Sequence, residues 1–196
     1  MSLNPVVLKF SLVQSKNCKT LTFKDLTGEY NVSSNPTGYP VEAFDPTPVA
    51  ELTITRPDGT IVVLDISADG FPTIDSSVAV TLDSADLGLA ANSALPDGIY
   101  TVKYKVTFST GFSRFTTKGI VLTCALECCV HKMYNALVDA KSYCNNDELI
   151  DAMYGFSLLQ DIQYEAECGS STAKIQEMLD TLTDMCANID CGCNCK

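Results

Sequence analysis

Cysteines and a single histidine are the residues of this 196-residue chain whose types could do chemistry. Only Cys18 lies in the first 123 residues, and the other nine cysteines follow, ending in the tail CGCNCK. Thiolate and imidazole are the usual ligands of structural zinc, so a metal site is one interpretation. The same cysteines could instead form disulfides, or remain free thiols that pack or contact another subunit.

The spacing of these residues suits a metal site better at the tail than upstream. Cys124, Cys128 and His131 would spread along a helix over about two turns, roughly 10 Å of rise, which is too far for one ion. No C-x-x-C pair occurs anywhere in the chain. We expect no cofactor, and mainly free thiols, while zinc and disulfides formed after release from the cell stay open; the candidate metal ligands are Cys144, Cys186, Cys191, Cys193 and Cys195.

Catalytic chemistry has little support in the sequence. A Cys-His pair would need His131 beside a thiol, and Cys128 is its only local candidate. We expect His131 to be a surface or interface residue, and Cys129, on an apolar stripe, to be a small buried hydrophobe. The phosphate-binding, zinc-protease and serine-hydrolase motifs are all absent. Capping or turn chemistry accounts for Asp83, Asp86 and Asp97, so we predict no enzyme and no catalytic or cofactor-binding residues.

Charge is unevenly distributed along the chain. Residues 1–122 carry 9 Lys and Arg against 12 Asp and Glu, and residues 123–196 carry 4 against 12, which gives net charges of −3 and −8. Such a surface repels nucleic acid, so no sequence-specific nucleic-acid partner is expected. The first residues resemble no secretory signal, and no apolar run approaches the roughly 18 residues of a membrane span. We therefore expect synthesis in a reducing cytoplasm and no membrane partner.

The elements that would position these residues fall into two classes. Short β-rich runs cut by turn residues predict an immunoglobulin-like β-sandwich over 1–123, with strands in 6–13, 20–26, 50–57, 60–66, 78–83, 99–108 and 114–123. TRPDG predicts a hairpin turn. Tyr100, which follows LPDG, is either the corner tyrosine of such a domain or an ordinary surface tyrosine on a strand.

One long connection, residues 25–48, is rich in Gly, Asn and Pro and shows no period. Structureless loops longer than about 12–15 residues are usually functional or disordered. This loop also holds Tyr30, Tyr39 and Phe44, which are apolar enough to lie against another surface. We interpret it as a docking loop with these three residues as interface candidates.

Residues 124–196 predict a cysteine-rich, acidic helical domain with an irregular tail. Helical periodicity covers 125–144, 145–168 and 170–189, with Asn145 or Asn146 as a cap and Gly169 as a stop. Short connections imply three antiparallel helices, which makes the fold class α+β. That order would gather the thiols at two separate ends, Cys186 and the tail joining Cys144. The apolar stripe of the middle helix includes Met153, and the stripes of the three helices together exceed what a small core can cover.

The loop DLTGEYNVSSNPTGY, the strand entry LPDGIYTVKY and the junction LTCALECCVHKM, followed by the cysteine-rich end, resemble small virion proteins of crAss-like tailed bacteriophages. Those proteins are neck, ring and tail components. The resemblance implies a non-enzymatic structural protein of the virion, made in the host cytoplasm. Its partners would be copies of itself in a ring and other neck, tail or portal proteins.

Two other functions stay open. The chain could be an immunoglobulin-like surface-binding module whose helical end is stabilised by disulfides. It could also be a small metal-binding protein that uses the C-terminal cysteines. A ring component predicts a large homo-oligomer, because apolar surface in excess of a small helical core marks an interface.

Overall fold

The computed structural model describes residues 8–27, 48–71, 78–107, 111, 113–139, 146–168 and 171–187. The chain forms two compact units, one of residues 1–95 with 101–118 and the other of 96–100 with 119–196. The second unit thus includes the start of one strand and the end of another besides the helices. The sequence predicted a domain boundary between residues 123 and 124, which would place the whole of both strands in the sandwich. That boundary stays a prediction.

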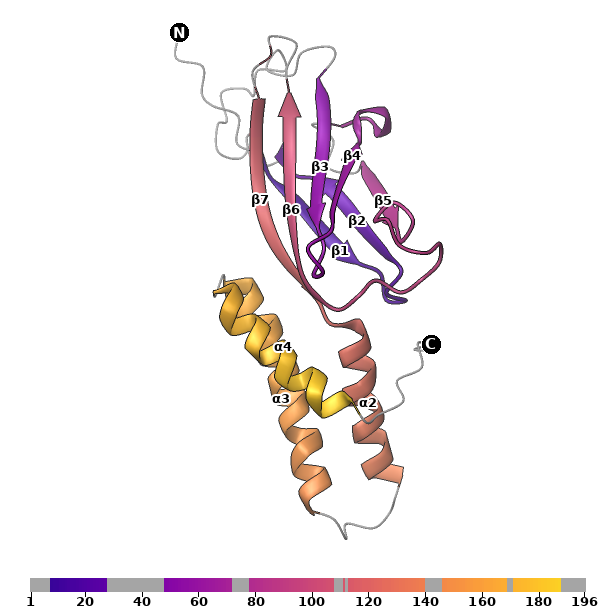
Figure 1. The fold of residues 1–196 in the computed structure, drawn as a ribbon, viewed down its shortest axis with the longest axis vertical. Helices are drawn as coiled ribbons and strands as arrows, with labels where there is room; N and C mark the ends of the chain where they lie inside the picture. Colours follow the sequence, from indigo (N-terminus) through magenta and orange to yellow (C-terminus); the bar gives the residue numbers. More distant parts are fainter. Residues whose placement is uncertain are drawn as a thin grey trace. The chain divides into compact units, whose positions relative to one another are not determined.

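All seven predicted strands are present in the described residues, and the α+β class is confirmed (Figure 1). They form two antiparallel sheets, one of three strands in the order β1-β2-β5 and one of four in the order β4-β3-β6-β7. The strands are β1 (Phe10–Gln14), β2 (Thr20–Asp25), β3 (Val49–Thr55), β4 (Ile61–Asp65), β5 (Ala79–Asp83), β6 (Gly98–Thr107) and β7 (Ser113–Leu122). A short 3₁₀ turn, η2 (Ser67–Asp69), follows β4.

The two sheets pack face to face around an aromatic core. Alternate residues of β2, β3 and β6 are buried, as the period of two in a half-buried strand requires. The Phe23 ring, on β2, meets the Tyr104 ring, on β6, edge to face at 5.1 Å between centroids. Phe10 and Phe71 lie against Phe23 at 5.6 and 5.2 Å.

A buried carboxylate joins the two sheets. Asp25, at the end of β2, accepts a hydrogen bond from the Tyr104 hydroxyl at 2.8 Å, and its other oxygen accepts from the Thr27 backbone N–H at 2.9 Å. All three residues are buried. Because each of these polar groups has a partner, the cost of removing it from water is offset.

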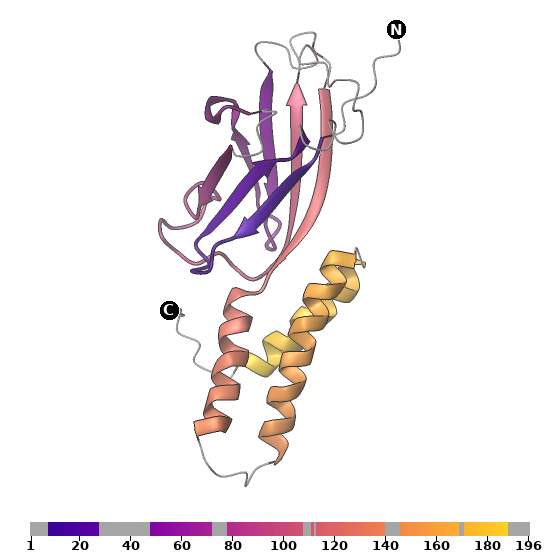
Figure 2. The ribbon, with the colours of Figure 1, turned by 180° about the vertical axis from the view of Figure 1, so that it is seen from behind.

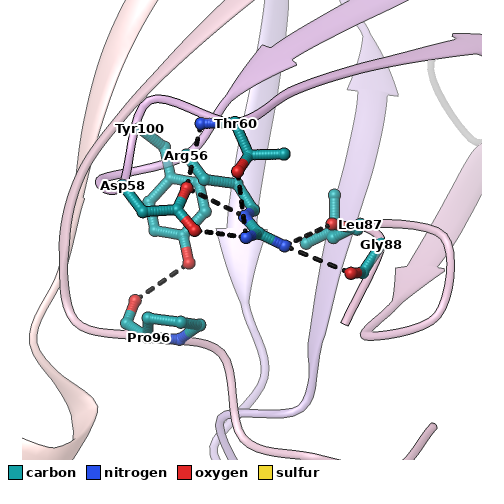
Figure 3. Close-up of polar contacts among 7 residues, drawn as sticks. All are labelled: Arg56, Asp58, Thr60, Leu87, Gly88, Pro96 and Tyr100. Atoms are coloured by element: carbon teal, nitrogen blue, oxygen red, sulfur yellow. Dashed lines mark hydrogen bonds and ion pairs between the residues drawn. The ribbon is translucent and has the colours of Figure 1, made fainter. Parts of the chain in front are cut away.

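The TRPDG hairpin turn is confirmed. Gly59 has φ +81°, the left-handed region that favours glycine, and the Asp58 carboxylate accepts from the Thr60 N–H at 2.9 Å. Figure 3 shows the Arg56 guanidinium paired with Asp58 and reaching the carbonyls of Leu87 and Gly88 at 3.0 and 3.3 Å. These Arg56 hydrogen bonds hold the pKa of Asp58 well below its usual range.

Tyr100 is not a surface residue, and its hydroxyl makes the backbone hydrogen bond expected of a corner tyrosine. It is fully buried near the start of β6, and its hydroxyl donates to the Pro96 carbonyl at 2.9 Å (Figure 3). A tyrosine that bonds back to the backbone four residues upstream fixes the entry of its strand.

The second unit contains the three predicted helices, α2 (Cys124–Asp139), α3 (Asn146–Cys168) and α4 (Thr172–Cys186). Figures 1 and 2 show α3 antiparallel to α2, and α4 crossing them obliquely. Ser171 caps α4, its side chain accepting from the Lys174 N–H at 3.3 Å. The helical core comprises Leu126, Val130, Leu158, Leu159, Ile162, Ile175, Leu179 and Leu182. No helix in the described part of the chain is long and apolar enough to cross a membrane.

Candidate functional site

A disulfide joins Cys186, one of the candidate metal ligands, to Cys129, which was expected to be a small buried hydrophobe. Cys129, in the second turn of α2, is bonded to Cys186, the last residue of α4, with 6.0 Å between their Cα atoms. This corrects two predictions, that Cys129 is a free buried thiol and that Cys186 lies at the opposite end with Cys144. In this bonded form Cys186 also has no thiolate to offer a metal.

Helix length and direction account for the pairing. α4 has 15 residues against 23 in α3, and it crosses obliquely, so it ends beside the middle of α2 (Figures 1 and 2). Its apolar stripe, Ile175, Leu179 and Leu182, is buried as predicted and turns Cys186 toward α2. The two sulfurs meet because both cysteines continue apolar stripes that pack together.

The other cysteines divide into bonded, free and undescribed ones. Cys18, Cys124 and Cys128 are also disulfide-bonded, which runs against the expectation of mainly free thiols. Cys168, at the end of α3, is free and exposed. Cys144, Cys191, Cys193 and Cys195 lie outside the described residues, and among the described ones no group of three His, Cys, Asp or Glu could hold a metal ion.

His131 is exposed on α2, which confirms its prediction as a surface residue. Its ring lies 5.6 Å from that of Phe156, and its Nδ1 is 3.2 Å from the Glu127 carbonyl oxygen. Since Cys128 is disulfide-bonded, this histidine has no free thiol there to activate. The arrangement therefore gives no Cys-His pair at this position.

Asp97 caps α2 from outside the helix. Its two carboxylate oxygens accept from the backbone N–H groups of Ala125 at 3.1 Å and Leu126 at 2.8 Å. Burial raises the pKa of Asp97, and these N–H donors oppose the rise. The capping role expected for Asp97 is confirmed, and Asp83 is confirmed in turn chemistry by accepting from Ala85 N–H at 2.7 Å.

The outer face of α3 is apolar and exposed. Ile150, Met153, Tyr154 and Tyr164 are each between 53 and 65% exposed and fall within one narrow stripe at helical spacing, together with Ser157 and Asp161. The sequence placed Met153 on an apolar stripe larger than a small helical core can cover, and Met153 is exposed. The buried face of α3 instead follows Gly155, Leu158, Leu159 and Ile162. Apolar residues occur on both sides of this helix, so periodicity alone could not select the inner one.

A second exposed apolar surface lies on the four-stranded sheet. Phe115, on the edge strand β7, is 65% exposed, and the Lys103 Nζ of neighbouring β6 sits 4.6 Å from its ring centroid. In the register, Lys103 faces Thr53 and Thr53 faces Val63, which is also exposed. On the same face, Lys105 is the cross-strand neighbour of Glu51, and Glu51 faces Asp65, so this surface carries charges of both signs.

The predicted docking-loop residues Tyr30, Tyr39 and Phe44 lie outside the described residues. Two surfaces within the described residues carry exposed apolar and charged side chains from which a binding site for a protein could be built. These surfaces are the outer face of α3 and the surface of β6 and β7.

Comparison with known proteins identifies no family. No family model matches the chain, and no curated protein matches it. Among solved structures, it is similar to part of the cell-surface-expressed multi-modular chitinase ChiW of Paenibacillus sp. str. FPU-7, with 15% identity and a TM-score of 0.35 over 62% of this chain and 9% of that one. It is also similar to part of a family 76 glycoside hydrolase from a bovine Bacteroides thetaiotaomicron strain, with 11% identity and a TM-score of 0.37 over 67% of this chain and 24% of that one. The chain spans less than a quarter of either enzyme, and TM-scores this low carry no argument about function.

Proposed function

We propose that this protein is a non-enzymatic structural component of a tailed-phage virion, assembling in many copies as a ring in the neck or tail. The observation that carries the proposal is the outer face of α3, where four large apolar side chains are exposed on an acidic helix. Contiguous exposed apolar surface marks a site of protein association. Its resemblance to virion proteins of crAss-like phages supplies the setting.

Two further features support an assembling role. The strand orders β1-β2-β5 and β4-β3-β6-β7, with the corner Tyr100, support an immunoglobulin-like sandwich, a fold common in extracellular assemblies. Head-to-tail contacts between such subunits close into rings when the rotation allows. Partners would be copies of the chain and other neck, tail or portal proteins.

The disulfides fit a virion, which is made in the host cytoplasm and then persists outside the cell. Cys129–Cys186 and the bonded Cys18, Cys124 and Cys128 would form where the surroundings are oxidising. The same bonds favour a second candidate, an immunoglobulin-like surface-binding module with a disulfide-stabilised helical end. Both functions are compatible with few free thiols, so a thiol count does not separate them.

Oligomeric mass separates the two candidates. Native mass spectrometry and sedimentation of the purified oxidised chain should give one large, discrete multimer for a ring component. A monomer at every concentration reached would contradict the ring and leave the surface-binding module. Electron microscopy of the multimer then tests whether it is closed and cyclic, and an open or irregular aggregate would also count against the proposal.

A further inference from the structure

The four-stranded sheet ends in two open edge strands. Among the described residues, β4 pairs only with β3, and β7 pairs only with β6. Proteins usually protect such edges with proline, lysine, a bulge or a covering segment, because unpaired N–H and C=O groups there are a template for another strand. β4, of sequence IVVLD, has no proline or lysine, and its pairing with β3 is continuous over five residues without a bulge. This edge is therefore suited to pair with a further strand.

The hydrogen-bond pattern shows which backbone groups of β4 are open. The β3–β4 ladder begins at the turn, where the Arg56 N–H donates to the Thr60 carbonyl at 2.9 Å. Bonded pairs then recur at every second residue, which leaves the backbone groups of three β4 residues pointing away from β3: Ile61, Val63 and Asp65. In the part of the chain that the structure describes, no other group bonds these N–H and C=O groups.

The same alternation identifies the open groups of β7. Carried through the register of β3 with β6, it makes the odd-numbered residues of β6 bond to β3 and the even-numbered ones bond to β7. Residues opposite each other share a face of the sheet, and Phe115 shares the face of Lys103, so the even-numbered residues of β7 bond to β6. The backbone groups of Ser113, Phe115 and Thr117 therefore point toward the open edge.

The two edges match in direction and in side chains. Neighbouring strands of the sheet run in opposite directions, so β4 and β7, the first and last of four, also run oppositely. A second copy in the same orientation would thus present its β4 antiparallel to β7, as neighbours in a large ring would. Ile61, Val63 and Phe115 are each about 60% exposed on the same outer face of the sheet. Aromatic and β-branched side chains on adjacent strands stabilise each other.

Charge differs in sign between the two edges. β4 lies within residues 57–97, which contain seven Asp and no Glu, Lys or Arg, and Asp65 is exposed. β7 carries Arg114 and Lys118 on the face opposite to Phe115, and it has no Asp or Glu. A symmetric β7–β7 pair centred midway between the two cations would place Arg114 opposite Lys118, and a β4–β4 pair would join two acidic edges. Opposite charge therefore favours β4 of a second copy as the partner of β7.

We propose that β7 of one copy pairs antiparallel with β4 of the next copy, with Phe115 beside Val63. This rests on the proposed function and deepens it, because it names the strands through which neighbours in the ring meet. The pairing gives the open backbone groups of both edges partners and packs the exposed apolar side chains together. It uses two different edges, so each end of a growing assembly keeps one open edge until the ring closes.

Charged substitutions at the two outward positions test the pairing in the full-length chain. Val63→Lys and Phe115→Glu should each make the copies associate about 10-fold more weakly, because each replaces the apolar pair by a charge against an apolar side chain. The double variant should recover multimers of natural mass, because the introduced lysine of one copy then lies beside the introduced glutamate of the next. Val49→Lys on β3 and Thr101→Glu on β6 make the same charge changes at exposed central positions of this sheet and should keep the assembly. Native mass spectrometry measures association, and melting temperatures check folding.

Hydrogen exchange tests the backbone contact in the natural chain. Peptides that cover β4 and β7 should exchange more slowly in the multimer than in the dissociated Val63→Lys chain, and peptides of the central strand β3 should not differ. Equal exchange at both edges would overturn the strand pairing but leave the ring. The same holds for natural-size multimers from either single variant, or for a double variant that melts at the natural temperature and stays dissociated. A natural chain that never assembles would overturn the proposed function and this pairing together.

Discussion

Asp97 gives α2 a cap that the helix does not supply for itself. The residue precedes β6, yet its carboxylate accepts from two N–H groups in the first turn of α2. Those N–H groups have no partners within the helix, and they form the positive end of its dipole. Burial of the carboxyl works against ionisation, and it raises the pKa of Asp97 despite these donors.

Asp97→Ala should therefore lower the free energy of unfolding by about 1 kcal/mol, the usual cost of a lost cap. Asp97→Asn keeps a side-chain oxygen that can accept from the helix N–H groups but removes the ionisable carboxyl. The folded carboxyl keeps its proton to higher pH than the unfolded one, so the natural chain loses stability relative to Asp97→Asn as pH rises from about 4 through the raised pKa. Urea denaturation at several pH values between about 3 and 7 measures this difference. A natural chain that gains stability relative to Asp97→Asn as pH rises would contradict the raised pKa. As a control, Asp69→Ala, at an exposed site, should change the free energy of unfolding by less than about 0.5 kcal/mol.

At the scale of elements, the three helices meet at Gly155. A Cβ built there would lie 3.6 to 3.7 Å from Met185, Leu182 and Val130, which is ordinary van der Waals contact. The glycine is buried, and each helix contributes to its surroundings. The site therefore has room for one methyl group and for little more.

Gly155→Ala should raise the free energy of unfolding by up to about 1 kcal/mol, because alanine favours the helix and no atom must move. Gly155→Leu should lower it by about 1–3 kcal/mol, because the added atoms would overlap α2 and α4. Chemical denaturation of the two variants and of Ser157→Ala, on the exposed face of α3, measures these changes. A loss of stability in Gly155→Ala would show that the helices are closer than described.

The Cys129–Cys186 bond is the other determinant of helix packing. It spans 57 residues of sequence, and closing a loop of that length in the unfolded chain removes entropy worth about 4 kcal/mol in the chain-entropy model. Cys129→Ala with Cys186→Ala should lower the free energy of unfolding by up to about that amount. Chemical denaturation under oxidising conditions checks it, with Cys168→Ala, at the exposed free thiol, expected to be neutral. An unchanged stability in the double variant would mean that the bond does not form.

Much of the element structure could be predicted from the sequence. Short β-rich runs, several of them alternating apolar with polar residues, identified every strand, and turn residues such as Asp58 and Gly59 marked their ends. Periodicity identified the helices, but it cannot give the angle at which they cross or the level at which a short helix ends. The Cys129–Cys186 pairing depends on both, so it was missed. The buried face of α3 was missed because apolar side chains lie on both of its sides.

At the scale of the whole molecule, apolar and charged surface is divided between distinct regions. The exposed apolar residues of α3 share a helix with six Asp and Glu, and the exposed Phe115 has the Lys103 ammonium over its ring. A chain with a net charge of −11 repels its copies at long range, so association requires local attraction strong enough to overcome that repulsion. The proposed assembly therefore depends on a few exposed side chains.

Met153→Glu should reduce the mass of the multimer without changing the melting temperature, because Met153 contributes little to the core of its own chain. Native mass spectrometry measures the first quantity and a thermal melt the second. Ala173→Glu, which adds the same charge at an exposed position on α4, should leave both unchanged. A lower melting temperature with an unchanged multimer would assign Met153 to folding instead of association.

The covalent link between α2 and α4 also determines how the chain would carry mechanical tension. Force transmitted along the backbone passes from Cys129 directly to Cys186 and bypasses everything between them. At about 3.4 Å per extended residue, the 57-residue segment would otherwise add about 190 Å of length when pulled. With the bond intact, α3 lies inside the closed loop and is shielded from stretching.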